Sequence, residues 1–271
     1  MATDGDRGSD GDRRTADPAR TIAALWGTRP PPRRGPRHTL TTAQVVAAAI
    51  AVADGDQDLD LLSMRRVAEA LGVGTMSLYT YIASRDELLE VMLDTVYAEA
   101  VDELATPGRA EDWREGLRRV ADVNWDLALR HPWVLQIFTG RPPLGPHTIA
   151  KYELELSVVD GIGLTDVEMD AVVTLVQTHV EGLARRRVEA DRTVRRTGLT
   201  DEQWWSLVAP PLAEVLDPAR FPIGSRVGQA AGQAHQAAHN PEHAYRFGLE
   251  RLIAGIDALI RSRTTPRRTR R

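Results

Sequence analysis

The stretch GVGTMSLYTYIASRDELLEVM, Gly72 to Met92, decides how the rest of the chain is interpreted. Its first part, residues 75–81, combines two threonines, a serine, a methionine and two tyrosines, and it carries no charge. A glycine turn precedes it. A strongly helical run that starts with the capping pattern Ser84-x-x-Glu87 follows it. Because these side chains are short and polar, the segment is expected to face away from the protein core.

Two further helical patterns stand before this segment. The first starts with the capping box Thr41-x-x-Gln44, and the second starts at Ser63. Apolar residues recur at helical spacing in the second, and Gly72 suits the left-handed position after its last turn. Helix, tight turn and short helix form the helix-turn-helix layout, in which the second helix enters the major groove of DNA.

Each residue type in the segment can make a contact that is common at protein–DNA interfaces. Hydroxyl groups bind phosphates and base edges, and the methyl groups of Met76 and threonine contact thymine methyls. The following helix places Arg85 in its first turn, where it suits a phosphate. An ordinary helical hairpin with a polar outer face is the alternative interpretation of the same pattern.

The length and composition of the chain exclude several classes of protein and of site. The 271 residues suffice for one large or two modest domains, and 42% are hydrophobic. The absence of cysteine excludes disulfides, thiolate zinc sites and cysteine nucleophiles. Neither a secretory signal nor an apolar run long enough for a bilayer is present, so we expect a cytoplasmic protein without membrane contact.

The net charge of −4 argues mildly against nucleic-acid binding, but its distribution matters more. Residues 18–38 contain five arginines and no acidic residue, and the last eleven residues contain six arginines. Arg33, Arg34 and Arg37 of the first segment are candidate DNA contacts. A disordered arm without a DNA role explains the same composition equally well.

The remaining sequence also has helical patterns and no alternating strand pattern, so an all-α fold is expected. Helices are predicted from about residue 111 to 130, 146 to 160 and 165 to 195, with others starting at Thr200 and Pro241. The predicted organisation is a basic arm with a short helix (1–38), a helix-turn-helix domain (39–105), a larger helical domain (106–262) and a basic tail (263–271).

Residues 25–104 resemble the DNA-binding domain of TetR-type transcriptional repressors. The run Leu78-Tyr79-x-x-x-x-Ser84-Arg85-x-x-Leu88 is the most diagnostic part. The resemblance implies phosphate contacts from Tyr79, Tyr81 and Arg85, and backbone contacts from Thr42 and Ser63. It assigns the base-reading or groove positions to Thr75, Met76, Ser77 and Thr80.

Residues 112–262 resemble the ligand-binding and dimerisation domain of the tetracycline-repressor branch, through RHPWVLQIFTGRPP and the helix layout. This resemblance implies a homodimer that binds palindromic operator DNA and is released by a small-molecule effector. The two subunits would meet through the long helix before Arg195 and the last helix, packed as a four-helix bundle across a two-fold axis. Whether the protein represses or activates, and which genes it controls, is left open.

Polar or aromatic residues on or near apolar helix stripes are candidates for an effector cavity. For Asn124, Glu153 and His179, an ordinary hydrogen bond inside the core is the alternative interpretation. The candidates are Asn124, Trp125, Trp133, Phe138, Arg141, Tyr152, Glu153 and His179. In the tetracycline repressor, a histidine binds the drug's magnesium where this chain has Ile137, so we expect no metal site and no cofactor.

Two other classes of protein remain as alternatives. An enzyme is disfavoured, because the sequence lacks a glycine-rich phosphate loop, a zinc-protease motif and a nucleophile elbow. A helical small-molecule-binding or scaffold protein that does not recognise DNA sequence is the second alternative. Operator binding distinguishes it from a regulator.

Overall fold

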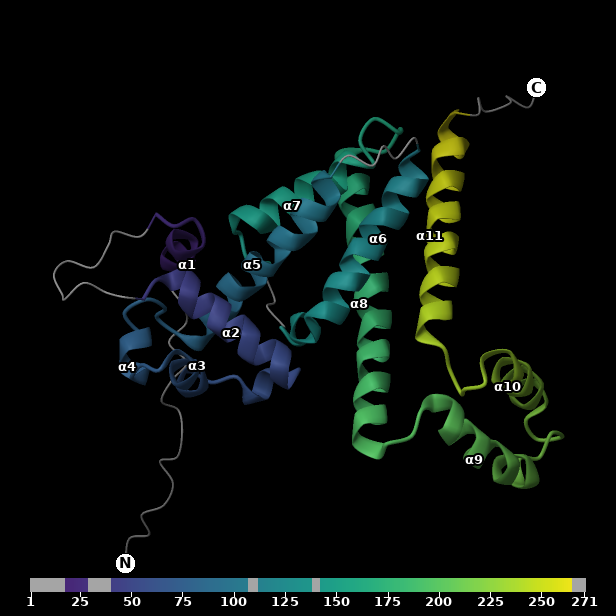
Figure 1. Ribbon diagram of the computed structural model, residues 1–271. Helices are drawn as coiled ribbons and strands as arrows, with labels where there is room; N and C mark the ends of the chain where they lie inside the picture. Colours follow the sequence, from purple (N-terminus) through teal and green to yellow (C-terminus); the bar gives the residue numbers. More distant parts are fainter. Residues whose placement is uncertain (1–17, 29–39, 107–111, 138–141, 265–271) are drawn as a thin grey trace, which may run out of the picture.

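A computed structural model describes residues 18–28, 40–106, 112–137 and 142–264, and these form helices joined by turns, with no strand among them (Figure 1). The expected all-α fold is confirmed. None of the helices in these ranges is long and apolar enough to cross a membrane. The arm arginines Arg33, Arg34 and Arg37 lie outside the described residues.

The helices fall into an N-terminal and a C-terminal group. The N-terminal group is α1 (Pro18–Leu25), α2 (Thr42–Asp56), η1 (Leu59–Leu61), α3 (Met64–Leu71), α4 (Thr75–Leu78) and α5 (Arg85–Ala105). The C-terminal group is α6 (Trp113–Arg130), η2 (Pro132–Gln136), α7 (Pro146–Ser157), α8 (Asp166–Thr197), α9 (Asp201–Val215), α10 (Pro222–His235) and α11 (Pro241–Thr264).

The predicted helix starts form as the sequence indicates. Thr41 and Gln44 complete a capping box at α2, and the Ser63 and Ser84 hydroxyls accept the backbone N–H three residues ahead. Gly72 ends α3 at φ 65°, the left-handed region that glycine enters at little cost. These caps fix the angle between α3 and α4.

Two apolar cores hold the helices. The first core lies among α2, α3, α4 and α5, where Val67, Ala68 and Leu78 are at most 1% exposed. It also takes in Trp133 from η2, so the C-terminal group closes one side of it. The second core lies among α6, α8 and α11. The N-terminal and C-terminal groups of helices therefore pack directly against each other.

The helices α9 and α10 form a hairpin that projects from the body and packs only lightly against the other helices (Figure 1). Helix α10 lies within residues 217–240, where the sequence pattern predicts no helix. Several large apolar side chains of the hairpin are exposed: Trp204, Leu207, Leu212, Val215, Phe221, Ile223 and Val227. The hairpin thus carries more apolar surface than its own contacts cover.

Candidate DNA-binding surface and effector cavity

The predicted DNA-reading segment presents its polar side chains outward from α4 and the turn after it. Leu78 points into the first core and is completely buried. Met76 is 79% exposed and Tyr79 is 40% exposed. Ser77 and Thr80 are also exposed, while Thr75 is half-buried. One short helix therefore combines a single buried anchor with an exposed uncharged face.

The flanking candidates lie at helix starts around this face. Thr42 is the first residue of α2 and is half-buried. The Ser63 hydroxyl accepts the backbone N–H of Arg66 at 3.3 Å, so it caps α3. Tyr81 is half-buried and packs against the first core. The positions are compatible with backbone contacts, and these roles remain predictions.

Arg85 makes two internal hydrogen bonds in this structure. Its Nε donates to the Leu62 carbonyl at 3.1 Å, and its Nη2 donates to the Leu59 carbonyl at 2.7 Å. The guanidinium thereby fixes the segment that leads into α3 to the start of α5. Its contact with a phosphate remains a prediction, and the structure adds a bracing role that the sequence analysis missed.

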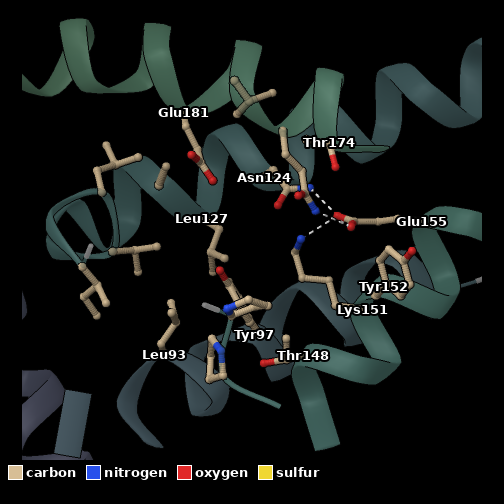
Figure 2. Close-up of a pocket in the computed structure, with 18 of the residues that line it drawn as sticks. Leu93, Tyr97, Asn124, Leu127, Thr148, Lys151, Tyr152, Glu155, Thr174 and Glu181 are labelled. Atoms are coloured by element: carbon tan, nitrogen blue, oxygen red, sulfur yellow. Dashed lines mark hydrogen bonds and ion pairs between the residues drawn. The ribbon is translucent and has the colours of Figure 1, made fainter. Parts of the chain in front are cut away.

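A cavity of about 610 Å³ lies between α5, α6, α7 and α8 (Figure 2). Leu93 and Tyr97 of α5, Leu127 of α6 and the 142–144 segment supply apolar and aromatic walls. Helices α7 and α8 supply most of the polar side chains. The cavity has the size and the mixture of surfaces typical of small-molecule sites.

A saturated polar network forms one wall of the cavity around Glu155, which is completely buried. Its carboxylate accepts hydrogen bonds from Lys151 Nζ at 2.6 Å, Asn124 Nδ2 at 2.8 Å and Gln177 Nε2 at 2.7 Å (Figure 2). Lys151 Nζ also lies 5.1 Å from the centre of the Tyr97 ring. The negative charge of Glu155 is thus matched by the ammonium of Lys151 and by two further donors.

Helix α8 turns a polar stripe toward the cavity. Its members recur at spacings of three or four residues: Asp170, Thr174, Gln177, Glu181 and Arg185. Asp170 accepts the Tyr152 hydroxyl at 2.7 Å, and Gln177 donates to Glu155. Burial raises the pKa of Glu181, and Lys151 and Arg185 oppose that rise. Burial also raises the pKa of Tyr97 across the cavity.

Of the predicted cavity residues, Asn124 and Tyr152 line this cavity. Phe138 and Arg141 lie outside the described residues. The two other aromatic candidates are elsewhere, which corrects the prediction. Trp125 is 7% exposed and stacks on Tyr245, with the ring centres 4.4 Å apart, in the second core. Trp133 is completely buried against the first core.

Glu153 and His179 are also misplaced by the sequence analysis. Glu153 is exposed, because α7 buries the side that carries Lys151 and Glu155. His179 lies between α8 and α11, where its Nε2 is 2.9 Å from the Tyr245 carbonyl. Gly248 leaves the room for this ring, since a Cβ there would collide with it. His179 therefore joins two helices and does not face the cavity.

Lys151, Glu155 and Glu181 are among the cavity residues that the sequence did not indicate. Lys151 is the single lysine of the chain. A buried lysine followed four residues later by a buried glutamate is an i, i+4 ion pair, and this spacing was a usable signal. Nothing in the sequence distinguishes Glu181 from the other acidic residues of α8.

Two polar contacts connect the cavity walls to the N-terminal helices. Asp94 of α5 is buried, and its carboxylate accepts the Thr148 backbone N–H and hydroxyl, both at 2.8 Å. It also lies 3.0 Å from His147 Nδ1, so it caps the first turn of α7. A Cβ at Gly145 would overlap this carboxylate. The same helix α5 therefore carries a cavity wall, the cap of α7 and Arg85.

The second connection runs through η2. The Gln136 side chain accepts the Leu59 N–H at 3.0 Å and donates to the Gln57 carbonyl at 3.2 Å. Arg192 of α8 donates to the same Gln57 carbonyl. Because Leu59 also holds Arg85, the segment before α3 contacts both groups of helices.

Comparisons with known proteins agree with this architecture. Residues 106–260 match the family model for the tetracyclin repressor-like C-terminal domain. The chain is 38% identical to the HTH-type transcriptional repressor DrrR1 of Streptomyces coeruleorubidus over 92% of this chain and 89% of that protein. The chain belongs to the TetR family of transcriptional regulators.

Two solved structures of this family share the fold closely. Apo ActR from Streptomyces coelicolor aligns with a TM-score of 0.67 at 26% identity, covering 84% of this chain and all of that one. ActR in complex with actinorhodin aligns with a TM-score of 0.66 at 27% identity, over 82% and 97% of the two chains. The combination of a helix-turn-helix unit and a helical ligand-binding domain is therefore that of a TetR-family regulator.

Proposed function

We propose that the chain is a ligand-responsive repressor that binds a palindromic operator as a homodimer in the cytoplasm and leaves it when an effector fills the cavity. The observation that carries the proposal is helix α5. It holds Arg85 beside the DNA-reading unit at one end, and further along it contributes Leu93 and Tyr97 to the cavity wall. A ligand that displaces α5 also displaces the reading helix.

The relatives support this function. DrrR1 carries the name of a transcriptional repressor, and ActR has been solved with actinorhodin bound. The sites that we assign to DNA are the exposed face of α4, with Thr42, Ser63, Tyr81 and Arg85 around it. The effector site is the cavity beside Asn124, Tyr152 and the Glu155 network.

Exposed apolar surface on α8 and α11 supports the homodimer. A groove of about 300 Å³ between these helices is lined by Val172, Leu175, Leu252, Ile256 and Leu259. Leu175 is 45% exposed and Leu259 is 38% exposed in the single chain. A second copy related by a two-fold axis would cover this groove, and the same patch would serve both subunits. The exposed apolar residues of the α9–α10 hairpin would be buried in the same dimer.

The two connections suggest how release works. An effector against α7 pushes on Asp94 through Thr148, and α5 moves with it. Arg85 then shifts the segment that leads into α3, while Gln136 anchors the other end of that segment. A small rotation of α5 changes the separation of the two reading helices, which must match one turn of DNA, about 34 Å.

A gel shift with DNA from upstream of the gene tests the function. The wild-type protein should give a discrete complex that weakens with salt and resists competitor DNA. Tyr79→Ala should abolish that complex, whereas Glu153→Ala, a surface change far from α4, should leave it intact. Equal affinity of all three proteins would contradict the assignment of α4. An operator complex that no cavity ligand dissociates would contradict the effector part.

A further inference from the structure

The charges that line the cavity are not all matched within it. Two lining side chains are basic, Lys151 and Arg185, and three are acidic, Glu155, Asp170 and Glu181. Glu155 receives three donors, and Asp170 receives the Tyr152 hydroxyl. Glu181 forms no hydrogen bond or ion pair with any residue that the structure describes.

The position of Glu181 makes this carboxylate available to a ligand. It extends from α8 into the cavity, on the side facing Leu127 and Tyr97 (Figure 2). Water reaches it from the open side, while the surrounding protein atoms still raise its pKa through burial. Glu181 is exposed in the single chain, so its carboxylate keeps contact with solvent and can accept a hydrogen bond from a positively charged ligand group in the cavity.

Lys151 does not offer a comparable site to an anion. Its ammonium is committed to Glu155 at 2.6 Å and lies over the Tyr97 ring. An anionic ligand would have to break that buried pair and would also face Glu181. The apolar walls opposite Glu181, formed by Leu93, Leu127 and Leu144, suit the body of a hydrophobic ligand.

We propose that Glu181 is the specificity-determining residue of the cavity, and that it selects effectors with an apolar body and a positively charged amine. This inference rests on the proposed effector function of the same cavity. The ammonium would form a charge-assisted hydrogen bond with the Glu181 carboxylate while the body lies against Leu93 and Leu127. The neutral Lys151–Glu155 wall would contact polar groups of the ligand.

A matched pair of dyes tests the charge preference directly. At neutral pH 9-aminoacridine is a cation and acridine is neutral, and the two share one ring system. Titration calorimetry with the full chain should show that 9-aminoacridine binds about tenfold more tightly than acridine, the change expected for one charge-assisted hydrogen bond. Glu181→Gln should remove that preference and leave acridine binding unchanged. Glu153→Gln, the same change on an exposed part of α7, should retain it.

The possible outcomes are distinct. If the two dyes bind wild type equally, or if Glu181→Gln keeps the preference, Glu181 does not select cations. Failure of both dyes to bind also overturns the inference, because the cavity would not accept apolar cations. The gel shift tests the proposed function separately, because it measures operator binding without a dye. If the protein does not bind the operator, the comparison of the two dyes still shows whether Glu181 selects cations.

Discussion

The indole Nε1 of Trp133 donates a hydrogen bond to the carboxylate of Asp54 at 2.6 Å, across 79 residues of sequence. This bond joins η2 of the effector-binding half to the last turn of α2 in the DNA-binding half. His131 Nδ1 lies 2.7 Å from the same carboxylate oxygen. This contact connects η2 directly to α2, without passing through α5.

Replacing Trp133 by phenylalanine should weaken this connection while keeping most of the packing. We expect a loss of about 1 kcal/mol in the free energy of unfolding, the usual net value of one hydrogen bond. Urea denaturation measures it. Trp204→Phe removes an indole from an exposed position and should have little effect. Equal stabilities of the two variants would show that the Trp133–Asp54 bond contributes nothing.

The buried pair of Lys151 and Glu155 should be far more sensitive to a change in one partner. Lys151→Met leaves the Glu155 carboxylate buried with only the donors of Asn124 and Gln177. We expect a loss of about 3 kcal/mol or more in the free energy of unfolding. The double variant Lys151→Met/Glu155→Gln removes both charges and should recover part of that loss. A single variant as stable as wild type would contradict the ion-pair description.

Gly248 should not tolerate a methyl group. Gly248→Ala places a Cβ against the His179 ring, and we expect a loss of about 1 to 3 kcal/mol. Gly228→Ala in α10 meets no atom within 4 Å and lies inside a helix, so it should be neutral or stabilising by up to about 1 kcal/mol. Thermal unfolding compares the two. Stabilisation by Gly248→Ala would show that His179 does not occupy this place.

The ion pair of Glu168 and Arg263 should make the packing of α8 on α11 dependent on pH. The hydrogen bond from Arg263, helped by Thr165, lowers the pKa of Glu168 to about 2. Because the folded-state pKa is depressed, the stabilisation is present above the ordinary glutamate pKa and is lost as the pH falls toward 2. An NMR titration should show the pKa of Glu168 rising in Arg263→Ala. An unchanged midpoint would exclude the ion pair.

The sequence predicted the helices where local rules suffice. Thr41 and Ser63 cap helices through hydrogen bonds to backbone N–H groups three residues ahead, and Gly72 ends a helix through its own left-handed backbone conformation. Both effects depend only on residues that are close in sequence. The cavity was only partly predictable, since its walls come from four helices that are distant in sequence. Asn124 and Tyr152 line the cavity, whereas Trp125 and His179 pack against residues of α11. When a polar residue lies on the apolar side of a helix, the sequence does not show which other helix that side will pack against.

The central claim is that two copies of α4 read two halves of one operator. Selection of bound duplexes from a random DNA pool by the full chain, followed by sequencing, tests it most directly. We expect the selected sequences to contain two inverted half-sites whose centres lie about one helical turn apart. The Tyr79→Ala variant should not enrich that sequence. Enrichment of a single, non-repeated site would contradict the dimer, and no enrichment would contradict sequence-specific binding itself.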